Sequence, residues 1–310
     1  MSTDRKAHPD GPAYADFVAA RNRAFSDSLT AILGRRSPSL VPFSLVRRYL
    51  SDGDERYLGL RTVALASIMG SEQRGADFTR RFAPRRSVDP HRWMSVAAAL
   101  RAERELPPVV LYEIGGVYFV RDGNHRVSVA RGAGVEFIDA EVYGLPSRAA
   151  LSPDMDVGEV VRVIVSSVRE RFARVTGLRP GNEGIESAQP EAWDALLAEI
   201  ERYRLLQGED VDLRDAARSW HSSMFLPLVG AARRAGVLRR GGEVEFYLLA
   251  SSWKAEYEEL ANACLDSDDL APRYLDRFHT GLGMRLLRAF TRRPPSPSAS
   301  PARSRASRPR

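Results

Sequence analysis

Two short apolar runs near the middle of the chain are separated by only two glycines. The runs are Val109–Ile114 and Val117–Arg121, and Gly115 and Gly116 lie between them. A two-residue link of this kind favours a primed turn, which needs positive φ and joins neighbouring antiparallel strands. The sequence therefore predicts a tight β-hairpin, and such a hairpin fixes the register of both its strands.

Further strands and helices are predicted around this hairpin. One strand is expected at Thr62–Ile68 and another at Val135–Tyr143. A helix is expected to begin after Asp89, a suitable N-cap followed by Pro90, and a short helix is expected at His125–Arg131. The order strand, helix, strand, strand, helix, strand, within about 100 residues, predicts a compact α+β unit.

Helical patterns flank this unit on both sides. Residues 14–33 place apolar side chains on a common helical face, namely Tyr14, Phe17, Val18, Phe25, Leu29, Ile32 and Leu33. After Pro146 the apolar spacing predicts further helices, of which one should kink or break at Pro227 and another contains Cys264. The chain is thus divided into an N-terminal helical segment (1–56), the α+β domain (57–148), a C-terminal helical region (149–288) and a tail (289–310).

The net charge of +6 is concentrated at the C-terminus. The segment Thr291–Arg310 contains six arginines and no acidic residue, so these arginines account for the whole excess. A segment rich in Pro, Ser and Arg cannot form a core and is expected to be disordered. It could bind DNA or another anionic surface by non-specific electrostatic attraction. The alternative is a solvated extension without a partner.

The single cysteine and the apolar pattern exclude several classes. Cys264 alone cannot form a disulfide within the chain or a multi-cysteine zinc site. No apolar run approaches the length of a membrane span, and the first residues are polar. A cytoplasmic protein with no membrane partner is therefore expected.

A cluster of polar residues follows the second hairpin strand, in the order Asp122, Gly123, Asn124, His125 and Arg126. Glycine permits a close approach to the backbone, and the N-terminus of the next helix would offer unpaired N–H groups to an anion. Arginine one turn later can donate two parallel hydrogen bonds to phosphate oxygens. The alternative is a tight turn in which Asn124 caps the helix, and the pattern alone leaves both interpretations open.

The string "ELPPVVLYEIGGVYFVRDGNHRVSVARGAGVEFIDAEV" (Glu105–Val142) resembles the ParB/sulfiredoxin superfamily. In that superfamily a strand preceded by proline and a hairpin strand lead to a Gly-x-x-Arg turn, a short helix and a further strand. The same order of motifs extends over residues 60–145. The part "VYFVRDGNHRVSVAR" looks similar to bacterial ParB-like proteins of uncharacterised function. The resemblance implies a ParB/sulfiredoxin-like α+β domain with helical flanks.

The resemblance also implies that the turn binds nucleotide phosphates. The cofactor expected from it is a nucleoside triphosphate or diphosphate with magnesium. An upstream arginine recurs in the superfamily, and "SEQRGADF" places Arg74 in that position. The expected phosphate ligands are Arg74, Gly123, Asn124, His125 and Arg126. Two carboxylates are candidates for a catalytic base, Asp122 and Glu113, and Asp122 is also the candidate metal ligand.

Departures from the superfamily pattern limit the activity that can be carried over. Asn124 stands where sulfiredoxins have their catalytic cysteine, so sulfinic-acid reduction is not expected. The Glu-Asn-x-x-Arg box of partition proteins is absent after Val142, and no helix-turn-helix pattern follows. Two functions stay open: a nucleotide-binding protein that hydrolyses or transfers a phosphoryl group, and a non-catalytic DNA-associated adaptor anchored by its tail. A homodimer is compatible with both of these functions.

Overall fold

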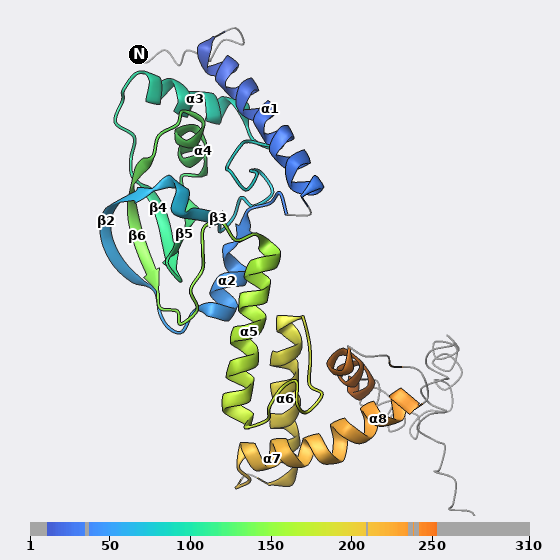
Figure 1. The fold of residues 1–310 in the computed structure, drawn as a ribbon. Helices are drawn as coiled ribbons and strands as arrows, with labels where there is room; N and C mark the ends of the chain where they lie inside the picture. The colour runs from blue at the N-terminus through green and yellow to red at the C-terminus, as the bar shows by residue number, and fades with distance from the viewer. Residues whose placement is uncertain (1–10, 35–36, 209, 235–237, 239–241, 253–310) are drawn as a thin grey trace, which may run out of the picture. The chain divides into compact units, whose positions relative to one another are not determined.

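The computed structural model describes residues 11–34, 37–208, 210–234, 238 and 242–252. In chain order the elements are α1 (Pro12–Leu33), β1 (Val41–Pro42), α2 (Phe43–Leu50), β2 (Arg56–Ala64), the 3-10 turn η1 (Leu65–Ser67), β3 (Ile68–Ser71), α3 (Pro90–Arg101), β4 (Val109–Ile114), β5 (Val117–Asp122), α4 (Asn124–Gly132), β6 (Phe137–Leu145), α5 (Val157–Thr176), α6 (Pro190–Gln207), α7 (Leu213–Trp220), the π-helical turn η2 (His221–Phe225) and α8 (Leu226–Arg234). The fold is α+β, as the sequence predicts (Figure 1).

By its internal contacts the chain forms two compact units. The first comprises residues 1–171 with 188–190, and the second comprises residues 172–187 with 191–310. The first unit contains the whole sheet, and the second contains α7 and α8. The four-part division at residues 56, 148 and 288 stays a prediction. Within the described ranges, no helix is both long and apolar enough to cross a lipid bilayer.

The six strands form one mixed sheet in the order β1-β3-β5-β4-β6-β2. The β1–β3, β3–β5 and β4–β6 pairs are parallel, whereas the β4–β5 and β2–β6 pairs are antiparallel. β1, β3 and β5 therefore all end at one edge of the sheet, where β4 begins. This arrangement brings the segments that follow β3 and β5 together at that edge.

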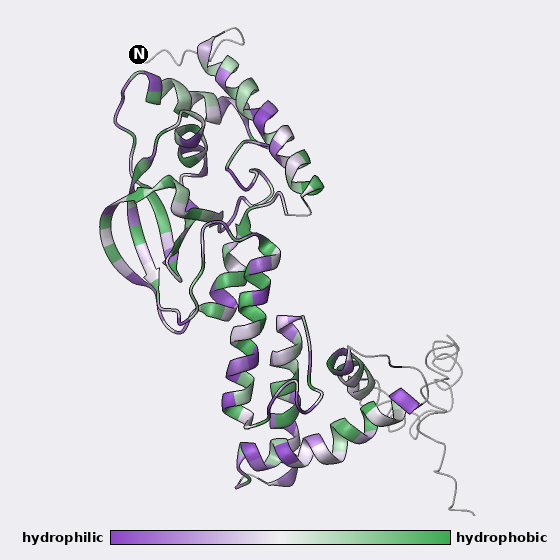
Figure 2. Ribbon diagram, viewed as in Figure 1, coloured by the Kyte–Doolittle hydropathy of each residue, from purple (hydrophilic) through white to green (hydrophobic). Residues whose placement is uncertain are grey.

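Helices α1, α3 and α4 share a hydrophobic core with one face of the sheet (Figure 1). Trp93 of α3 is buried in this core, and its Nε1 donates a hydrogen bond to Oγ of Ser128 on α4 at 2.9 Å. On the opposite face, Phe43 of α2 stacks on Tyr112 of β4 with a centroid distance of 4.2 Å. Hydrophobic residues recur along the strands between these layers (Figure 2). The sheet thus holds the start of α4 in a fixed place.

The central predictions are confirmed. The hairpin has the expected bounds, except that β5 runs one residue further, and both glycines of its turn have positive φ. Asp89 caps α3 by accepting a hydrogen bond from the His91 N–H at 2.9 Å. α4 begins one residue earlier than predicted and ends one residue later. Local patterns were sufficient here because each element has its own turn or cap residue.

Two predictions are corrected, and the predicted helix near the N-terminus exposes its apolar face. The strand expected at Thr62–Ile68 is wrong as a single element, because η1 interrupts it and separates β2 from β3. The strand expected at Val135–Tyr143 is displaced by two residues, to β6. On α1 the face that carries most of the large apolar side chains is not the buried one. Its buried residues are Phe17, Ala20 and Ala24, and exposed hydrophobic residues include Phe25 (69%), Ile32 (63%) and Leu33 (83%).

In the second unit the helix that contains Pro227 is interrupted just before the proline. Proline lacks an N–H group, so the preceding turn loses a regular hydrogen bond. The chain widens there into η2 and then continues as α8. His221, in η2, is buried and stacks on Phe225 at 5.6 Å. The predicted helix that contains Cys264 begins within the described residues, where 243–252 are helical, but its remainder and the tail lie outside them.

Candidate functional site

The candidate site lies at the edge of the sheet where β3 and β5 both end. Ser71 of β3 is opposite Val120 of β5, and the N–H of Glu72 donates to the carbonyl of Val120 at 2.9 Å. The chain leaves β5 at Gly123, one residue before α4. Ligands of parallel α/β sheets bind outside the carboxyl ends of the strands. The same edge here carries the polar cluster and the loop that contains Arg74.

Gly123 links β5 to α4 in a left-handed conformation, with φ 101° and ψ 22°. A Cβ atom at this position would lie 2.6 Å from Cγ1 of Val109 and 3.1 Å from Nε of Arg126. The backbone conformation and the contact with β4 each require glycine, independently of any ligand. The link then opens into the N-terminus of α4, where the first N–H groups have no partners within the helix. This is the backbone arrangement that binds anions in other proteins.

Arg126 ties the start of α4 to the segment before β4. Its Nη1 donates hydrogen bonds to the carbonyls of Pro107 and Pro108, at 2.5 and 2.7 Å. Its Nη2 lies 2.5 Å from Oδ2 of Asp122. The Arg126 side chain is 17% exposed and that of Asp122 is 62% exposed. Three of the five guanidinium N–H groups therefore donate to protein acceptors, and two remain for any other acceptor.

Asn124 and His125 are buried at the N-terminus of α4, and each is 8% exposed. Within the described part of the chain, Oδ1 of Asn124 and Nδ1 of His125 have no hydrogen-bond partner. The His125 ring contacts the edge of Phe78, with a centroid distance of 5.6 Å. A buried polar atom without a partner costs about 1–3 kcal/mol, so native proteins pair nearly all of them. Two such atoms on adjacent residues mark a position where a bound molecule would supply hydrogen bonds.

The surroundings of His125 favour its neutral form. Burial is the largest cause that lowers its pKa, and the positive charges of Arg92 and Arg74 act in the same direction. The carboxylates of Asp89 and Asp77 raise the pKa of His125, but their effect is smaller, so the pKa stays below 6.5. A neutral imidazole donates from one nitrogen and accepts at the other. The two arginines also give this end of α4 a positive environment.

Arg74 lies in the loop after β3. Its backbone N–H donates to Oγ of Ser71 at 3.3 Å, and its Nη1 donates to Oδ2 of Asp77 at 3.0 Å. Burial alone would raise the pKa of Asp77, but hydrogen bonds from Ser87 and Arg74, together with the charge of Arg74, lower it. The structure thus brings Arg74 to the same site as His125. The Arg74 side chain is 45% exposed, so a ligand could reach it.

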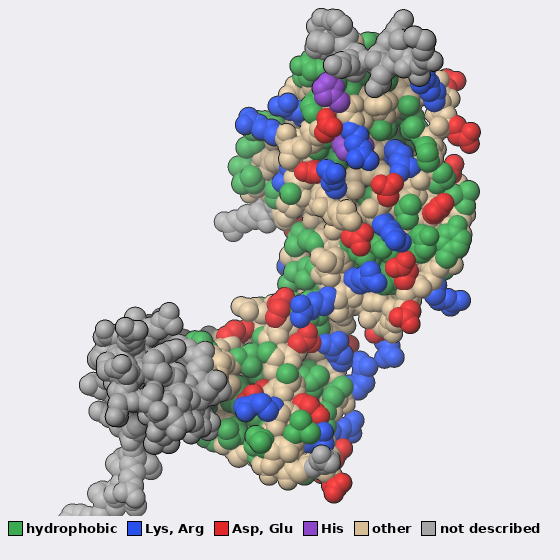
Figure 3. Space-filling model, turned by 180° about the vertical axis from the view of Figure 1, so that it is seen from behind, with side chains coloured by type: hydrophobic (Ala, Val, Ile, Leu, Met, Phe, Trp, Pro, Cys, Tyr) green, Lys and Arg blue, Asp and Glu red, His purple; other side chains and the backbone are tan. Residues whose placement is uncertain are grey.

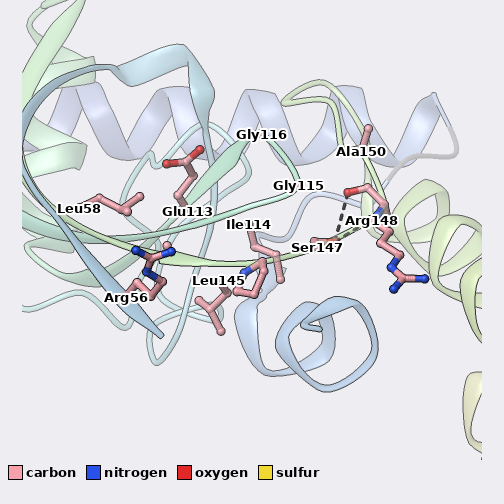
Figure 4. Close-up of a pocket in the computed structure, with 13 residues that line it drawn as sticks. Arg56, Leu58, Glu113, Ile114, Gly115, Gly116, Leu145, Ser147, Arg148 and Ala150 are labelled. Atoms are coloured by element: carbon pink, nitrogen blue, oxygen red, sulfur yellow. Dashed lines mark hydrogen bonds between the residues drawn. The ribbon is translucent and has the colours of Figure 1, made fainter. Parts of the chain in front are cut away.

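Glu113 is not brought to this site. It lies three residues further along β4 than Val110, which is the partner of Asp122. Its Oε2 lies 3.5 Å from Nη1 of Arg61. Glu113 lines a different pocket of 460 Å³ beside the hairpin turn, together with Arg56 (Figure 4). The two candidate catalytic carboxylates therefore belong to different ends of the sheet.

A magnesium ion would find few protein ligands at the turn. In the described ranges, no group of three or more His, Cys, Asp or Glu side chains is placed to hold a metal. Asp122 is the carboxylate next to Gly123, and it is already paired with Arg126. Magnesium commonly binds one or two carboxylates and takes its other ligands from phosphates and water. Asp122 fits that limited role, because most of its side chain is exposed.

The charges of the described surface are mixed. Figure 3 shows basic and acidic side chains interspersed over the face it presents, rather than a continuous basic surface. Many arginines are paired with nearby carboxylates, as in the Arg101–Asp16 pair at 2.6 Å.

Comparisons with known proteins give a partial likeness to a solved structure. No protein-family model matches the chain, and no curated protein sequence matches it. A crystal structure of sulfiredoxin from Arabidopsis thaliana is similar to it with a TM-score of 0.22 and 18% sequence identity. The likeness covers 27% of this chain and 82% of that sulfiredoxin. At this TM-score the likeness gives no information about activity.

Several site residues were not predicted from the sequence. Asp77, Asp89 and Arg92 surround His125, although they come from a loop and from the start of α3. The sequence indicates Asp89 only as a helix cap. No local pattern connects these residues, because they meet only when β3 and β5 pair in parallel and α3 packs on α4.

Proposed function

We propose that the chain is a ParB/sulfiredoxin-like nucleotide-binding protein that holds nucleotide phosphates at the N-terminus of α4. The observation that carries this proposal is the pair of buried polar atoms, Oδ1 of Asn124 and Nδ1 of His125, that have no partner within the described structure. They lie beside backbone N–H groups that are oriented for an anion. The order of motifs from Glu105 to Val142 supports the same assignment.

Each residue would have a distinct part in binding. The N–H groups at the start of α4 would donate to phosphate oxygens, and Nδ1–H of a neutral His125 would add a side-chain donor. The amide of Asn124, whose oxygen and nitrogen can exchange places by a flip, would donate or accept according to the ligand. Arg74 would contribute its charge from the facing loop. Arg126 would chiefly hold the turn in shape.

Hydrolysis or transfer of the phosphoryl group is the catalytic form of this proposal. It requires a carboxylate that binds magnesium or orients the attacking oxygen. Asp122 is the carboxylate at the turn, and it would have to exchange its pairing with Arg126 for a metal. Binding without turnover needs no such exchange. The DNA-associated alternative depends on Thr291–Arg310, which lies outside the described residues.

The test is calorimetric titration of the full-length protein with ATP, ADP, CTP and GTP in the presence of magnesium. We expect at least one nucleotide to bind, and we expect His125→Ala to weaken its binding by about tenfold, the effect of one lost charge-assisted hydrogen bond. His91→Ala, at an exposed position on α3, is the matched control and should bind as the wild type does. The proposal is wrong if no nucleotide binds, or if both variants bind equally well.

A further inference from the structure

A second charged cleft lies within the first unit, at the other end of α4 from Gly123. Its volume is 620 Å³, and the charged residues that line it are Asp27, Arg80, Arg81, Arg131, Asp154 and Asp156. Ile68 and Met69, both buried, also line it. α4 has nine residues and a length of about 13 Å at 1.5 Å per residue, so the cleft and the phosphate turn are separate places.

Arg131 carries a positive charge that no carboxylate neutralises within the described residues. Its Nη2 donates to the carbonyls of Leu65 and Ile68, and its guanidinium lies 4.9 Å from the centroid of the Phe82 ring. Its Nε and Nη1 make no hydrogen bond with any described residue, and neither atom is enclosed. Burial, together with the charges of Arg80 and Arg81, lowers the pKa of Arg131 to about 10. A bound anion would relieve this repulsion.

A tight turn brings the other two arginines to the cleft. The N–H of Phe82 donates to the carbonyl of Thr79 at 2.7 Å, and Arg80 and Arg81 occupy the two central positions. Phe82 has φ 60°, a left-handed conformation that is costly for a bulky side chain, and its ring is fully buried. Residues held in strained conformations cluster at binding sites. Here the ring of the strained residue lies under the Arg131 guanidinium.

The acidic residues of the cleft leave hydrogen-bond donors of Arg81 and Arg131 without an acceptor among the described residues. Oδ1 of Asp156 accepts a hydrogen bond from the N–H of Glu159 at 2.8 Å and so caps α5. Asp27 is 3.6 Å from Nη1 of Arg81, beyond hydrogen-bonding distance, and Arg81 is 79% exposed. Asp154 is exposed. Donors of Arg81 and Arg131 therefore remain available to a ligand.

We infer that this cleft binds a small-molecule oxyanion between Arg81 and Arg131. The ligand would carry a phosphate or carboxylate group, because guanidinium pairs with either in the same two-point geometry. The lining residues Ile68 and Met69 would lie beside its carbon skeleton. This site is independent of nucleotide binding at Gly123, since the two share no residue.

The test uses the full-length ¹⁵N-labelled protein, titrated at constant ionic strength with inorganic phosphate and, separately, with sodium acetate. Backbone amide resonances of Thr79–Phe82 report on the cleft, and those of Asn124–Arg126 report on the phosphate turn. We expect saturable shifts at Thr79–Phe82. Stronger binding of phosphate would assign a phosphate ester as the ligand class, and stronger binding of acetate would assign a carboxylate.

Two variants make this test specific. Arg81→Ala should weaken binding at the cleft by about five- to tenfold, since it removes one charge-assisted contact. Arg61→Ala is the matched control, because Arg61 also has a single ion pair, of 3.5 Å, and lies outside the cleft. Arg131 is left intact because its hydrogen bonds hold the backbone before β3. The inference is overturned if neither anion causes saturable shifts at Thr79–Phe82, or if Arg81→Ala binds as tightly as Arg61→Ala.

Discussion

Arg126 and Asp122 form an ion pair across the first turn of α4, with Nη2 of the arginine 2.5 Å from Oδ2 of the aspartate. The same guanidinium also holds the carbonyls of Pro107 and Pro108 before β4. One side chain thus fixes the position of the β5–α4 junction against the neighbouring strand. The arginine of the Gly-x-x-Arg turn thus holds in place the backbone at which an anion would bind.

Replacing Arg126 by alanine should therefore destabilise the fold. The variant leaves two carbonyls without their donor and Asp122 without its partner, and we expect a loss of about 2–3 kcal/mol in the free energy of unfolding. Urea unfolding followed by circular dichroism would measure it. Asp122→Asn is the matched comparison, and it should cost less than about 1 kcal/mol because Asp122 is mostly exposed. Equal midpoints for Arg126→Ala and the wild type would contradict the structural role of Arg126.

Much of the fold follows from short-range patterns, and the site follows only in part. The hairpin, the cap at Asp89 and the Gly123 turn each depend on a few consecutive residues, so their signals are local. The break between β2 and β3 has no such signal, because the apolar run continues through η1. The environment of His125 depends on contacts between distant segments. The hydrogen bonds from Arg126 to backbone carbonyls also could not be predicted, because no local pattern in the sequence indicates which acceptor an arginine side chain will contact.

Alanine at position 123 should be more costly than alanine at another left-handed glycine. Gly123 and Gly134 have φ 101° and 75°, but only at Gly123 would a Cβ meet a neighbour, at 2.6 Å from Val109. Gly134→Ala should cost about 1 kcal/mol for the backbone conformation alone. Gly123→Ala adds a steric clash, and we expect a total loss of about 2–4 kcal/mol by urea unfolding. Equal losses in the two variants would show that the contact with β4 can relax freely.

His125 should make the stability of the protein depend on pH in mildly acidic solution. Its folded-state pKa is lowered, chiefly by burial, from 6.5. The unfolded chain therefore binds a proton before the folded chain does, and stability falls as the pH drops below 6.5 towards the folded-state pKa. Above pH 6.5 this stabilisation is fully present.

The measurement for His125 is the urea midpoint between pH 7.5 and 5.5. His125→Gln cannot be protonated, so its midpoint should fall less over this range than that of the wild type. His91→Gln, at an exposed position, should keep the wild-type dependence. If the urea midpoints of the wild type and of His125→Gln fall equally as the pH is lowered, His125 is not the source of the pH dependence.

In the second unit, the hydrogen bond between Trp220 and Tyr247 should be a major source of stability. Trp220 is fully buried and its Nε1 donates to Oη of Tyr247 at 2.8 Å. Tyr247→Phe leaves this indole N–H without an acceptor, so we expect a loss of about 1–3 kcal/mol in urea unfolding followed by tryptophan fluorescence. Tyr203→Phe removes a hydroxyl that forms hydrogen bonds with Ser219 and Ser223 near the surface, and it should cost less.

The ionisation of Tyr247 gives an independent check on the same contact. Burial is the main cause that raises its pKa from 10 to about 12. The unfolded chain loses this proton first, so the contribution to stability is complete below pH 10 and is lost as the pH rises towards 12. An ultraviolet titration of the folded protein should show one tyrosine that ionises near pH 12 and is missing in Tyr247→Phe. If the two titration curves coincide, Tyr247 is not held in the buried environment that surrounds Trp220.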